Sequence, residues 1–427
     1  MYRGLHDKNM RNRSSDRNHG RHITATILSV ASVFAILLIV LVFSGILPTG
    51  LMKAPKTPQV VAVKGNSDPV PSSSSVNASS TVSTVSDTNT PVTNAAITNA
   101  ASTSSSIATD EKKSRKITVS AVGDCSLGKL QIHSYERSFL NYYDKYGKDY
   151  FFKYVAPYFK NDDLTLANLE GVLSNSTDRV EKTFNIEGLP EYVDILKDGG
   201  VDAVTTANNH IWDYGDQGMQ DTWNALDLAG IPYAYYDKTV LKEVNGVKVG
   251  LVSDCCIYLE QKDEDYVRNG IDSLRASGAD IVVVMLHWGV EMSHYPEAWQ
   301  IDFAHRIIDW GADLIIGSHP HVLQGIEQYN GKMILYSEGN FCFGGNLNPT
   351  DKDSMIWQQT FTYSTGSNEP AISMKVIPCR ISTRKDHNNF RPVPLKGSEA
   401  KEVIDRLNEY SSKLGNTPVR INDDGTI

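Results

Sequence analysis

Polar side chains of the kinds that bind metal ions follow five short, β-branched stretches of the chain. The carboxyl ends of strands in an open α/β sheet meet at one edge, so these side chains are expected to converge. Residues two apart in an extended segment point to one side, which pairs Asn168 with Glu170 and His319 with His321. The residues at the five ends are Asp124, then Asn168 and Glu170, then Asn209 and His210, then His287, and last His319 and His321.

Imidazole and carboxylate ligands together suit Zn, Mn or Fe. One or two such divalent ions would orient a phosphate-like or acyl group and activate water near neutral pH. The other histidines beyond residue 116 have no comparable placement, so we expect structural or surface roles for them. They are His133, His294, His305 and His387.

The strands that bring these side chains together must belong to a layered α/β domain, which we expect over residues 116–427. Each predicted strand is a nearly continuous apolar run, typical of a strand buried on both faces. The predicted strands are residues 116–124, 163–171, 201–210, 278–289 and 311–321. Helical patterns with proline near the start or glycine after the end lie between them. The predicted helices are Pro190–Asp198, Asp216–Ala229, Asp263–Ala276 and Pro296–Trp310.

Asn245-Gly246 and Asn330-Gly331 each separate two apolar runs, which predicts a two-residue hairpin turn at both places. A β-rich stretch over Met355–Pro394 is followed by a helical pattern near Glu399–Leu414. Together these patterns predict a mixed β-sheet layered with helices.

Six motifs occur in a fixed order along the domain: AVGDCSLG, LANLEG, TTANNHIWDYGDQGM, LHWGVE, GSHPHVLQGIE and YSEGNF. In this order and with these gaps they closely resemble the CapA family of capsule and poly-γ-glutamate synthesis proteins, which has a calcineurin-like metallophosphatase fold. The resemblance spans about Lys116 to Gly345. It implies a divalent metal site whose ligands would be Asp124, Glu170, Asn209, His287, His319 and His321.

The resemblance also implies that His210 protonates a leaving group. Asp213 can orient that imidazole by accepting its second N–H, although a residue of a helix N-terminal turn is the alternative. Glu291 and Glu338 belong to the CapA pattern as ligands or as groups that orient ligands. Asn168 and Asn340 are assigned to the same supporting shell.

The chain departs from the wider metallophosphatases at two places. Their Asp-x-His corresponds to Asp124-Cys125-Ser126, which lacks the histidine. Their GDxxD corresponds to residues 167–170, which leaves Glu170 or Asn168 as the bridging ligand. Whether the site holds two metal ions, one or none therefore stays open.

The N-terminal quarter of the chain has a different composition. Residues 23–47 carry no charge and are long enough to span a bilayer as a helix, with a cleaved signal peptide as the competing interpretation. The basic residues 1–22 before it predict a cytoplasmic N-terminus. Residues 48–115, rich in Ser, Thr and Ala, predict a disordered stalk. We therefore expect a single-pass protein of the cell membrane with an extracellular C-terminal domain.

The charge of the domain limits the classes of partner that it can bind, and the cysteine count limits the possible disulfides. The net charge is −9, and residues 111–427 alone carry −13, because residues 1–22 carry +4 and residues 23–110 are balanced. Such an acidic domain argues against a general nucleic-acid binder. Five cysteines without a CxxC pair leave at least one free thiol if all pairing is internal, and the pairing itself is open.

Three functions remain. The first is a metal-dependent hydrolase or transferase acting on an anionic extracellular polymer, for which the resemblance implies poly-γ-glutamate or a capsule polymer. The second is a non-catalytic export or assembly component, working with other membrane subunits of a polymer synthase and using the degenerate metal site for binding. The third, a metallophosphoesterase of an unidentified substrate, rests on fold alone.

Overall fold

The computed structural model describes residues 114–427, apart from residue 368 and residues 416–418. The predicted basic segment 1–22, the membrane-spanning helix 23–47 and nearly all of the stalk 48–115 lie outside the described residues. Among the residues described, no helix combines the length and the apolar character needed to cross a membrane. The first strand begins at Arg115, one residue before the predicted start of the domain.

Strands and helices alternate through most of the domain and give way to strands near its end. The strands are β1 (Arg115–Ser126), β2 (Lys129–Leu130), β3 (Leu164–Leu169), β4 (Val172–Leu173), β5 (Ile186–Gly188), β6 (Ala203–Thr205), β7 (Tyr233–Ala234), β8 (Val240–Val244), β9 (Val247–Cys256), β10 (Ile281–Trp288), β11 (Leu314–Ser318), β12 (Ile326–Tyr329), β13 (Lys332–Leu335), β14 (Asn340–Phe343), β15 (Asp353–Tyr363), β16 (Ala371–Arg380) and β17 (Val393–Pro394). The helices are α2 (Phe139–Tyr146), α3 (Ala156–Phe159), α4 (Val193–Gly199), α5 (Gly215–Ala229), α6 (Gln261–Ala276), α7 (Ala298–Asp309) and α8 (Gly397–Ser411).

Two mixed sheets form the centre of the domain. The first has the order β17-β16-β15-β1-β3-β6-β7, with β14 also paired to β1, and the second has the order β12-β13-β11-β10-β9-β8. In the first sheet the strands from β1 to β7 are parallel and those from β1 to β17 are antiparallel. In the second sheet β9, β10, β11 and β13 are parallel, and β8 and β12 pair antiparallel at the two edges. The five predicted strands are therefore divided between two sheets, three in the first and two in the second.

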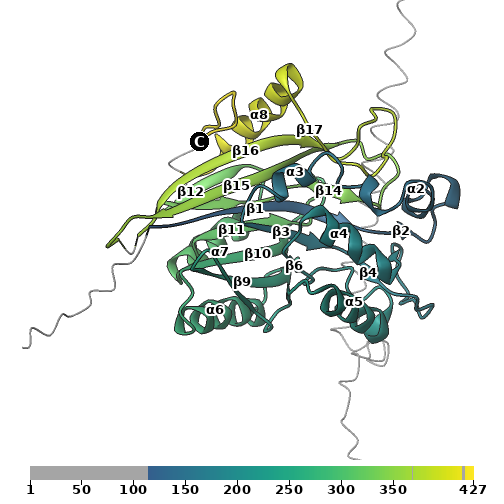
Figure 1. Ribbon diagram of the computed structural model, residues 1–427, viewed down its shortest axis with the longest axis horizontal. Coiled ribbons are helices and arrows are strands. Elements are labelled where there is room, and N and C mark those ends of the chain that lie inside the picture. The colour runs from purple at the N-terminus through teal and green to yellow at the C-terminus, as the bar shows by residue number, and fades with distance from the viewer. Residues whose placement is uncertain (1–113, 368, 416–418) are drawn as a thin grey trace, which may run out of the picture. The chain divides into compact units, whose positions relative to one another are not determined.

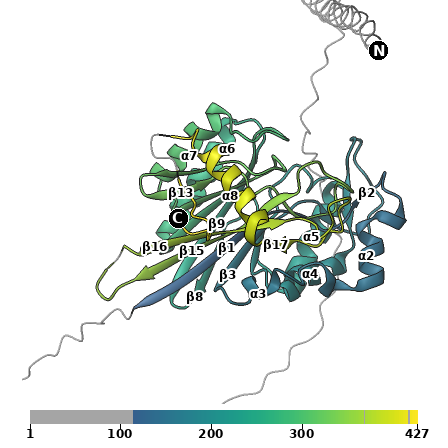
Figure 2. The ribbon, with the colours of Figure 1, turned by 90° about the horizontal axis from the view of Figure 1, so that it is seen from above.

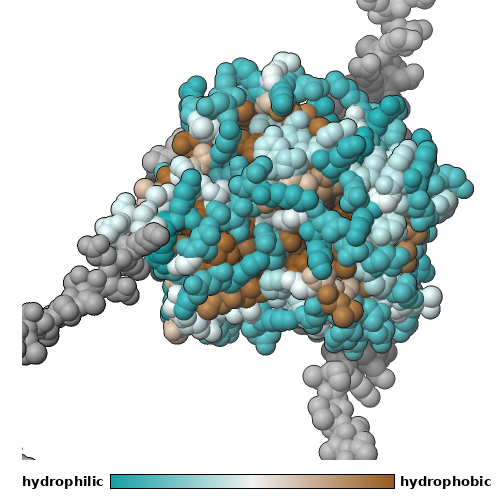
Figure 3. Space-filling model, in the orientation of Figure 1, coloured by the Kyte–Doolittle hydropathy of each residue, from teal (hydrophilic) through white to brown (hydrophobic). Residues whose placement is uncertain are grey.

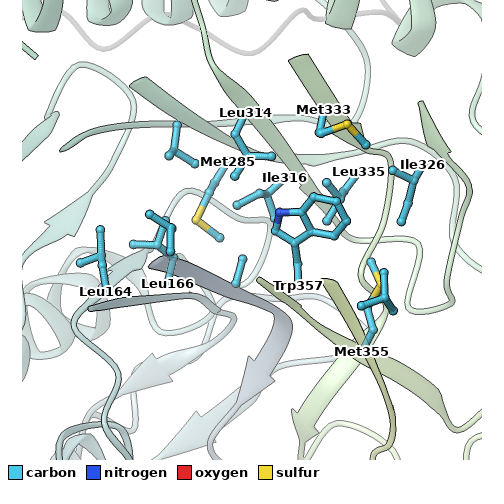
Figure 4. Packing of buried hydrophobic residues seen from close by; sticks show 14 of the residues in the cluster. Leu164, Leu166, Met285, Leu314, Ile316, Ile326, Met333, Leu335, Met355 and Trp357 are labelled. Atoms are coloured by element: carbon cyan, nitrogen blue, oxygen red, sulfur yellow. The ribbon is translucent and has the colours of Figure 1, made fainter. Parts of the chain in front are cut away.

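The two sheets pack face to face over a common apolar core. Alternate residues of β1 and of β10 enter this core, and the residues between them on β10 pack with those of the helices on the outer face. Both faces of β10 are therefore buried, which explains its continuous apolar run. Trp357 of β15 is fully buried in the core near Met285 of β10 and Leu335 of β13 (Figure 4).

Helices cover the outer faces of both sheets (Figures 1 and 2). Residues of α2, α3, α4 and α5 pack on the first sheet, and residues of α6 and α7 pack on the second. The helix α8 adds Val403, Ile404 and Leu407 to the core between the sheets. The outer surface in Figure 3 is mostly hydrophilic, interrupted by groups of hydrophobic residues.

The layered α/β prediction is confirmed, and most predicted elements are present within a few residues. Both hairpins occur, since Val244 pairs with Val247 and Tyr329 pairs with Lys332 across the Asn-Gly turns. The helix predicted from Pro296 begins at Ala298, because Glu297 and Gln300 form a capping box. The strand predicted over 201–210 is only three residues long, so Asn209 and His210 lie in the turn beyond it.

Candidate metal centre

The predicted site residues meet where the central strands of both sheets end. Asp124 of β1 is paired in register with Asn168 of β3 and with Asn340 of β14. In the other sheet, His287 of β10 is paired with Ser318 of β11, and the His319–His321 segment follows directly. Because the sheets face each other, the ends of their parallel strands deliver these side chains to one buried region.

Asn168 joins the two halves of this region. Its Nδ2 donates to Asp124 Oδ1 over 2.7 Å and lies 3.1 Å from His287 Nδ1 on the other sheet. Asn208, which the sequence analysis did not select, donates to Asn168 Oδ1 over 3.2 Å and to the Leu169 carbonyl over 2.8 Å. The Asn168 side chain therefore orients Asp124 and His287 with its amide fixed by a neighbour.

Glu170 places one carboxylate oxygen among three imidazoles. Its Oε1 lies 3.7 Å from His287 Nε2 and 3.9 Å from both His210 Nε2 and His321 Nε2, and it has no hydrogen-bond partner within the described domain. Burial, and then the charge of Asp124, raises the pKa of Glu170 to about 8. A fully buried oxygen facing nitrogen ligands at these distances, without a hydrogen bond, fits a bound divalent cation.

Three of the four imidazoles at the centre have pKa values shifted in different directions. Burial, together with the neighbouring imidazoles, lowers the pKa of His287 well below its usual value and lowers that of His319 to about 4. Burial also opposes protonation of His321, but Glu170 and Asp124 outweigh it and raise its pKa to about 9. Neutral imidazoles such as the first two are the form that binds metal ions.

The His319–His321 segment has a strained backbone. His319 has φ 95° and His321 has φ 59°, both in the region that side chains other than glycine rarely adopt. Such residues cost on the order of 1–3 kcal/mol each and cluster at functional sites. The segment is held at its ends, since the His319 N–H donates to Asp124 Oδ2 over 3.3 Å and His321 Nδ1 lies 3.0 Å from Asn340 Oδ1.

His210 contacts the residue predicted to orient it. Its Nδ1 lies 2.7 Å from Asp213 Oδ2, and its Nε2 faces Glu170. Lys182 donates from Nζ to Asp213 Oδ1 over 2.5 Å and to the Asn209 carbonyl over 3.0 Å. No motif pointed to Lys182, because it lies between β4 and β5, outside every predicted strand and helix.

The remaining predicted residues differ in their burial and in their contacts with the centre. Asn209 Oδ1 lies 3.0 Å from His287 Nε2. Glu338 is fully buried and neither of its carboxylate oxygens has a partner among the described residues, so burial and the charge of Asp124 raise its pKa well above the usual value. Glu291 is exposed, yet its carboxylate and the imidazoles of His319 and His321 together form one set of possible metal ligands.

Two groups of ligand atoms have the spacing of a metal site in the described part of the chain. One contains Asp124, Glu170 and His321, and the other contains Glu291, His319 and His321. His321 belongs to both. This arrangement suits either one ion or two ions that share a ligand, so the question raised by the sequence stays open.

Three residues next to the predicted ligands also contact the centre. Ser126 donates its hydroxyl to Glu170 Oε2 over 3.3 Å, and Ser318 Oγ lies 3.1 Å from His287 Nδ1. Ser318 and Asn208 each precede a predicted ligand directly, in GSHPH and ANNH, so proximity in sequence was the available signal.

Two of the histidines predicted to be structural have their own local partners. His305 stacks on Tyr329 with ring centroids 3.8 Å apart, and its Nε2 lies 3.0 Å from Glu327. His294 stacks on Tyr410.

All five cysteines fall among the described residues and are free thiols, and burial raises the pKa of Cys125 to about 12.

Comparison with known proteins points to one family. The model of the family "Bacterial capsule synthesis protein PGA_cap" matches residues 118–345, which contain every predicted site residue. The capsule biosynthesis protein CapA of Bacillus anthracis is 32% identical over 296 residues, or 63% of this chain and 69% of that protein. The PGA biosynthesis protein CapA of Bacillus subtilis is 32% identical over 319 residues, or 69% of this chain and 79% of that protein.

A more distant relative has a related name. A probable polyglutamine synthesis accessory protein of Mycobacterium tuberculosis is 27% identical over 257 residues, covering 52% of this chain and 66% of that protein. The names of the three relatives refer to the synthesis of a capsule, of PGA and of polyglutamine, respectively.

Proposed function

Because this chain belongs to the CapA family of bacterial capsule synthesis proteins, we propose that it acts in making a capsule or poly-γ-glutamate polymer at the cell surface. Its role there is that of a metal-dependent hydrolase or transferase acting on the polymer. The observation that carries the proposal is the position of Glu170 Oε1, unpartnered among the described residues and within 4 Å of three imidazole nitrogens. The proposal places the protein in the cell membrane, with its catalytic domain outside.

The residues that would hold the metal are Asp124, Glu170, Asn209, His287, His319 and His321. A bound divalent ion supplies Lewis-acid polarisation of an acyl or phosphoryl oxygen. Asn168 and Asn340 hold Asp124, His287 and His321 in place through the hydrogen bonds described above. The ion would also offset the negative charge of the domain, which otherwise repels an anionic polymer.

His210 is the proposed general acid and base. With Nδ1 directed at Asp213, its Nε2 is left to give or take a proton on the side of Glu170. Lys182 neutralises Asp213 from the opposite oxygen and so keeps that carboxylate in place. These contacts define a proton-transfer group beside the proposed ligands.

A non-catalytic role is the second candidate, and one observation favours it. At the two positions where the chain departs from metallophosphatases, Ser126 and Asn168 use their polar groups for hydrogen bonds to Glu170 and Asp124. In this role the site binds the polymer, and the protein assists its export or assembly with other membrane subunits of a synthase. A phosphoesterase activity stays a third candidate, on fold alone.

Metal content and polymer cleavage together test the proposal. Full-length protein is purified as wild type, His319→Ala and the matched control His305→Ala, whose histidine lies outside the centre. We expect at least one transition metal ion per wild-type and control chain and a loss in His319→Ala, by elemental analysis. We further expect His210→Ala to retain the metal but lose cleavage or transfer of poly-γ-glutamate, followed by chain length on gels.

Two results would decide against catalysis. Wild-type protein free of metal that still binds the polymer would favour the assembly role. Unchanged polymer processing in both His210→Ala and His319→Ala would exclude the proposed mechanism.

A further inference from the structure

A large cavity lies apart from the metal centre. Its volume is about 850 Å³, and it is bounded by α2, the 3₁₀ turn Lys148–Tyr150 and the loop that follows β16. Tyr142, Tyr146 and Tyr150 line one wall, with the rings of Tyr146 and Tyr150 stacked at a centroid distance of 4.7 Å. None of the residues that line it belongs to the predicted site.

The cavity is cationic in an otherwise acidic domain. Lys153, Arg384 and Arg391 line it, against the single lining carboxylate of Asp149, and Arg384 also pairs with Asp386 over 3.2 Å. The guanidinium of Arg391 lies 4.4 Å from the centroid of the Tyr150 ring, and its buried Nε has no hydrogen-bond partner in the part of the chain described. Neither Arg391 nor the exposed Lys153 forms an ion pair with any carboxylate among the described residues, so both charges are available to a ligand.

The loop that lines the cavity is fixed to the strand that supports the metal centre. Asn388 donates from Nδ2 to the Phe343 carbonyl over 2.7 Å, and Cys342 Sγ donates to the Phe390 carbonyl. Phe343 ends β14, the strand that begins with Asn340, and its ring lies 4.9 Å from that of His321. In Figures 1 and 2, α2 lies toward the carboxyl end of β1, the end that carries the centre.

We propose that this cavity is a second binding site, which holds a carboxylate-bearing segment of the anionic polymer while another segment reaches the metal centre. The inference rests on the proposed function and names the substrate class as a polymer with repeated free carboxylates. Guanidinium groups bind carboxylates through paired hydrogen bonds, and more than one cation in the cavity matches carboxylates repeated along a chain. The tyrosines add hydroxyl donors and apolar surface for the segments between charges.

Binding of a labelled oligomer to the full-length protein tests this site. The probe is a short γ-linked glutamate oligomer carrying a fluorophore, with its amidated, uncharged counterpart as a second probe, and the readout is fluorescence anisotropy at low salt. The main variant is Lys153→Ala/Arg384→Ala, because both side chains are exposed and their loss leaves the fold intact. Arg391→Gln is the second variant, and Lys262→Ala/Lys401→Ala removes the same charge from α6 and α8 as a matched control.

We expect the dissociation constant of the charged oligomer to rise roughly tenfold in the main variant. It should also rise in Arg391→Gln and stay within about twofold of wild type in the control pair and in His319→Ala. The uncharged oligomer should bind weakly to every form. Circular dichroism of each variant establishes that it is folded.

The outcomes separate this inference from the proposed function. Equal binding by the wild type and the cavity variants, with loss in His319→Ala, overturns the second site but leaves polymer processing at the metal centre. Equal weakening in the control pair overturns it too, since net charge would then explain the effect. No binding of the charged oligomer by wild type overturns this inference and removes poly-γ-glutamate as the polymer, whereas metal content and polymer processing test the proposed function separately.

Discussion

Asn168 Nδ2 lies 3.1 Å from His287 Nδ1 and thereby links the two sheets at the centre of the site. The same nitrogen donates to Asp124 over 2.7 Å. An amide nitrogen at this position can donate hydrogen bonds to a carboxylate and to an imidazole at once, whereas a carboxylate would leave Asp124 facing a second negative charge. We therefore expect the identity of residue 168 to control how strongly the stability of the domain depends on a bound cation.

Replacing Asn168 by aspartate should make stability depend on metal. In Asn168→Asp the buried carboxylates adjoin without a donor between them, which should cost roughly 1–3 kcal/mol in EDTA. Added Mn²⁺ or Zn²⁺ should restore the loss, because the cation replaces the missing donor. Thermal unfolding with and without EDTA checks this, with the exposed Asn224→Asp as control. Equal unfolding temperatures of Asn168→Asp and wild type in EDTA would contradict this prediction.

Removing the support of His210 should lower turnover without removing metal. Asp213→Asn and Lys182→Met each weaken the contacts that hold the imidazole at Nδ1, and supporting groups of this kind typically contribute about 10- to 100-fold. We expect kcat for polymer processing to fall by that factor while KM and metal content stay near wild type. Lys242→Met, which breaks a surface pair with Asp202, is the control. A change confined to KM would argue that these residues bind substrate instead.

Stability should fall with rising pH because of Asp254. Burial, and then the charge of Asp263, raises the pKa of Asp254 to about 8, so the folded state holds a proton that the unfolded state releases near pH 4. The free energy of unfolding therefore decreases as pH rises from about 4 to about 8. Asp254→Asn should remove this decrease and be more stable than wild type at pH 8.

Urea unfolding of Asp254→Asn and wild type between pH 5 and 9 measures the effect. The exposed Asp272→Asn on α6 controls for the loss of one negative charge. Parallel pH profiles for wild type and Asp254→Asn would show that Asp254 is ionised in the folded protein.

Truncating Trp357 should test the packing between the sheets. The side chain is fully buried in the shared core, so Trp357→Ala should lower the free energy of unfolding by about 3–5 kcal/mol. Trp212, which is 43% exposed, provides the control, and Trp212→Ala should change it by less than about 1 kcal/mol. Denaturant unfolding followed by far-ultraviolet circular dichroism gives both values. A similar loss of unfolding free energy in both variants would contradict the prediction, because burial between the sheets would then not explain the contribution of Trp357.

Local patterns were enough to predict which side chains meet at the candidate metal centre. Asp124, Asn168, His287 and the His319–His321 pair were selected because each ends an apolar run, and the ends of parallel strands converge in any layered α/β domain. The Asn-Gly hairpins were equally accessible, since a two-residue turn is encoded by adjacent residues. The family followed from six short motifs in order, and the match over residues 118–345 confirms it.

The sequence by itself determined the residue types, their order and the ends of the strands that carry them, because strand alternation and turn chemistry act over a few residues. Only the tertiary structure decided that two sheets rather than one deliver the predicted ligands, and that Glu170 Oε1 faces three imidazoles. It also brought Lys182 to Asp213 and placed Arg391 over Tyr150, contacts that span 31 and 241 residues. Such contacts depend on how whole sheets and loops pack, and no periodicity within a short segment specifies that packing.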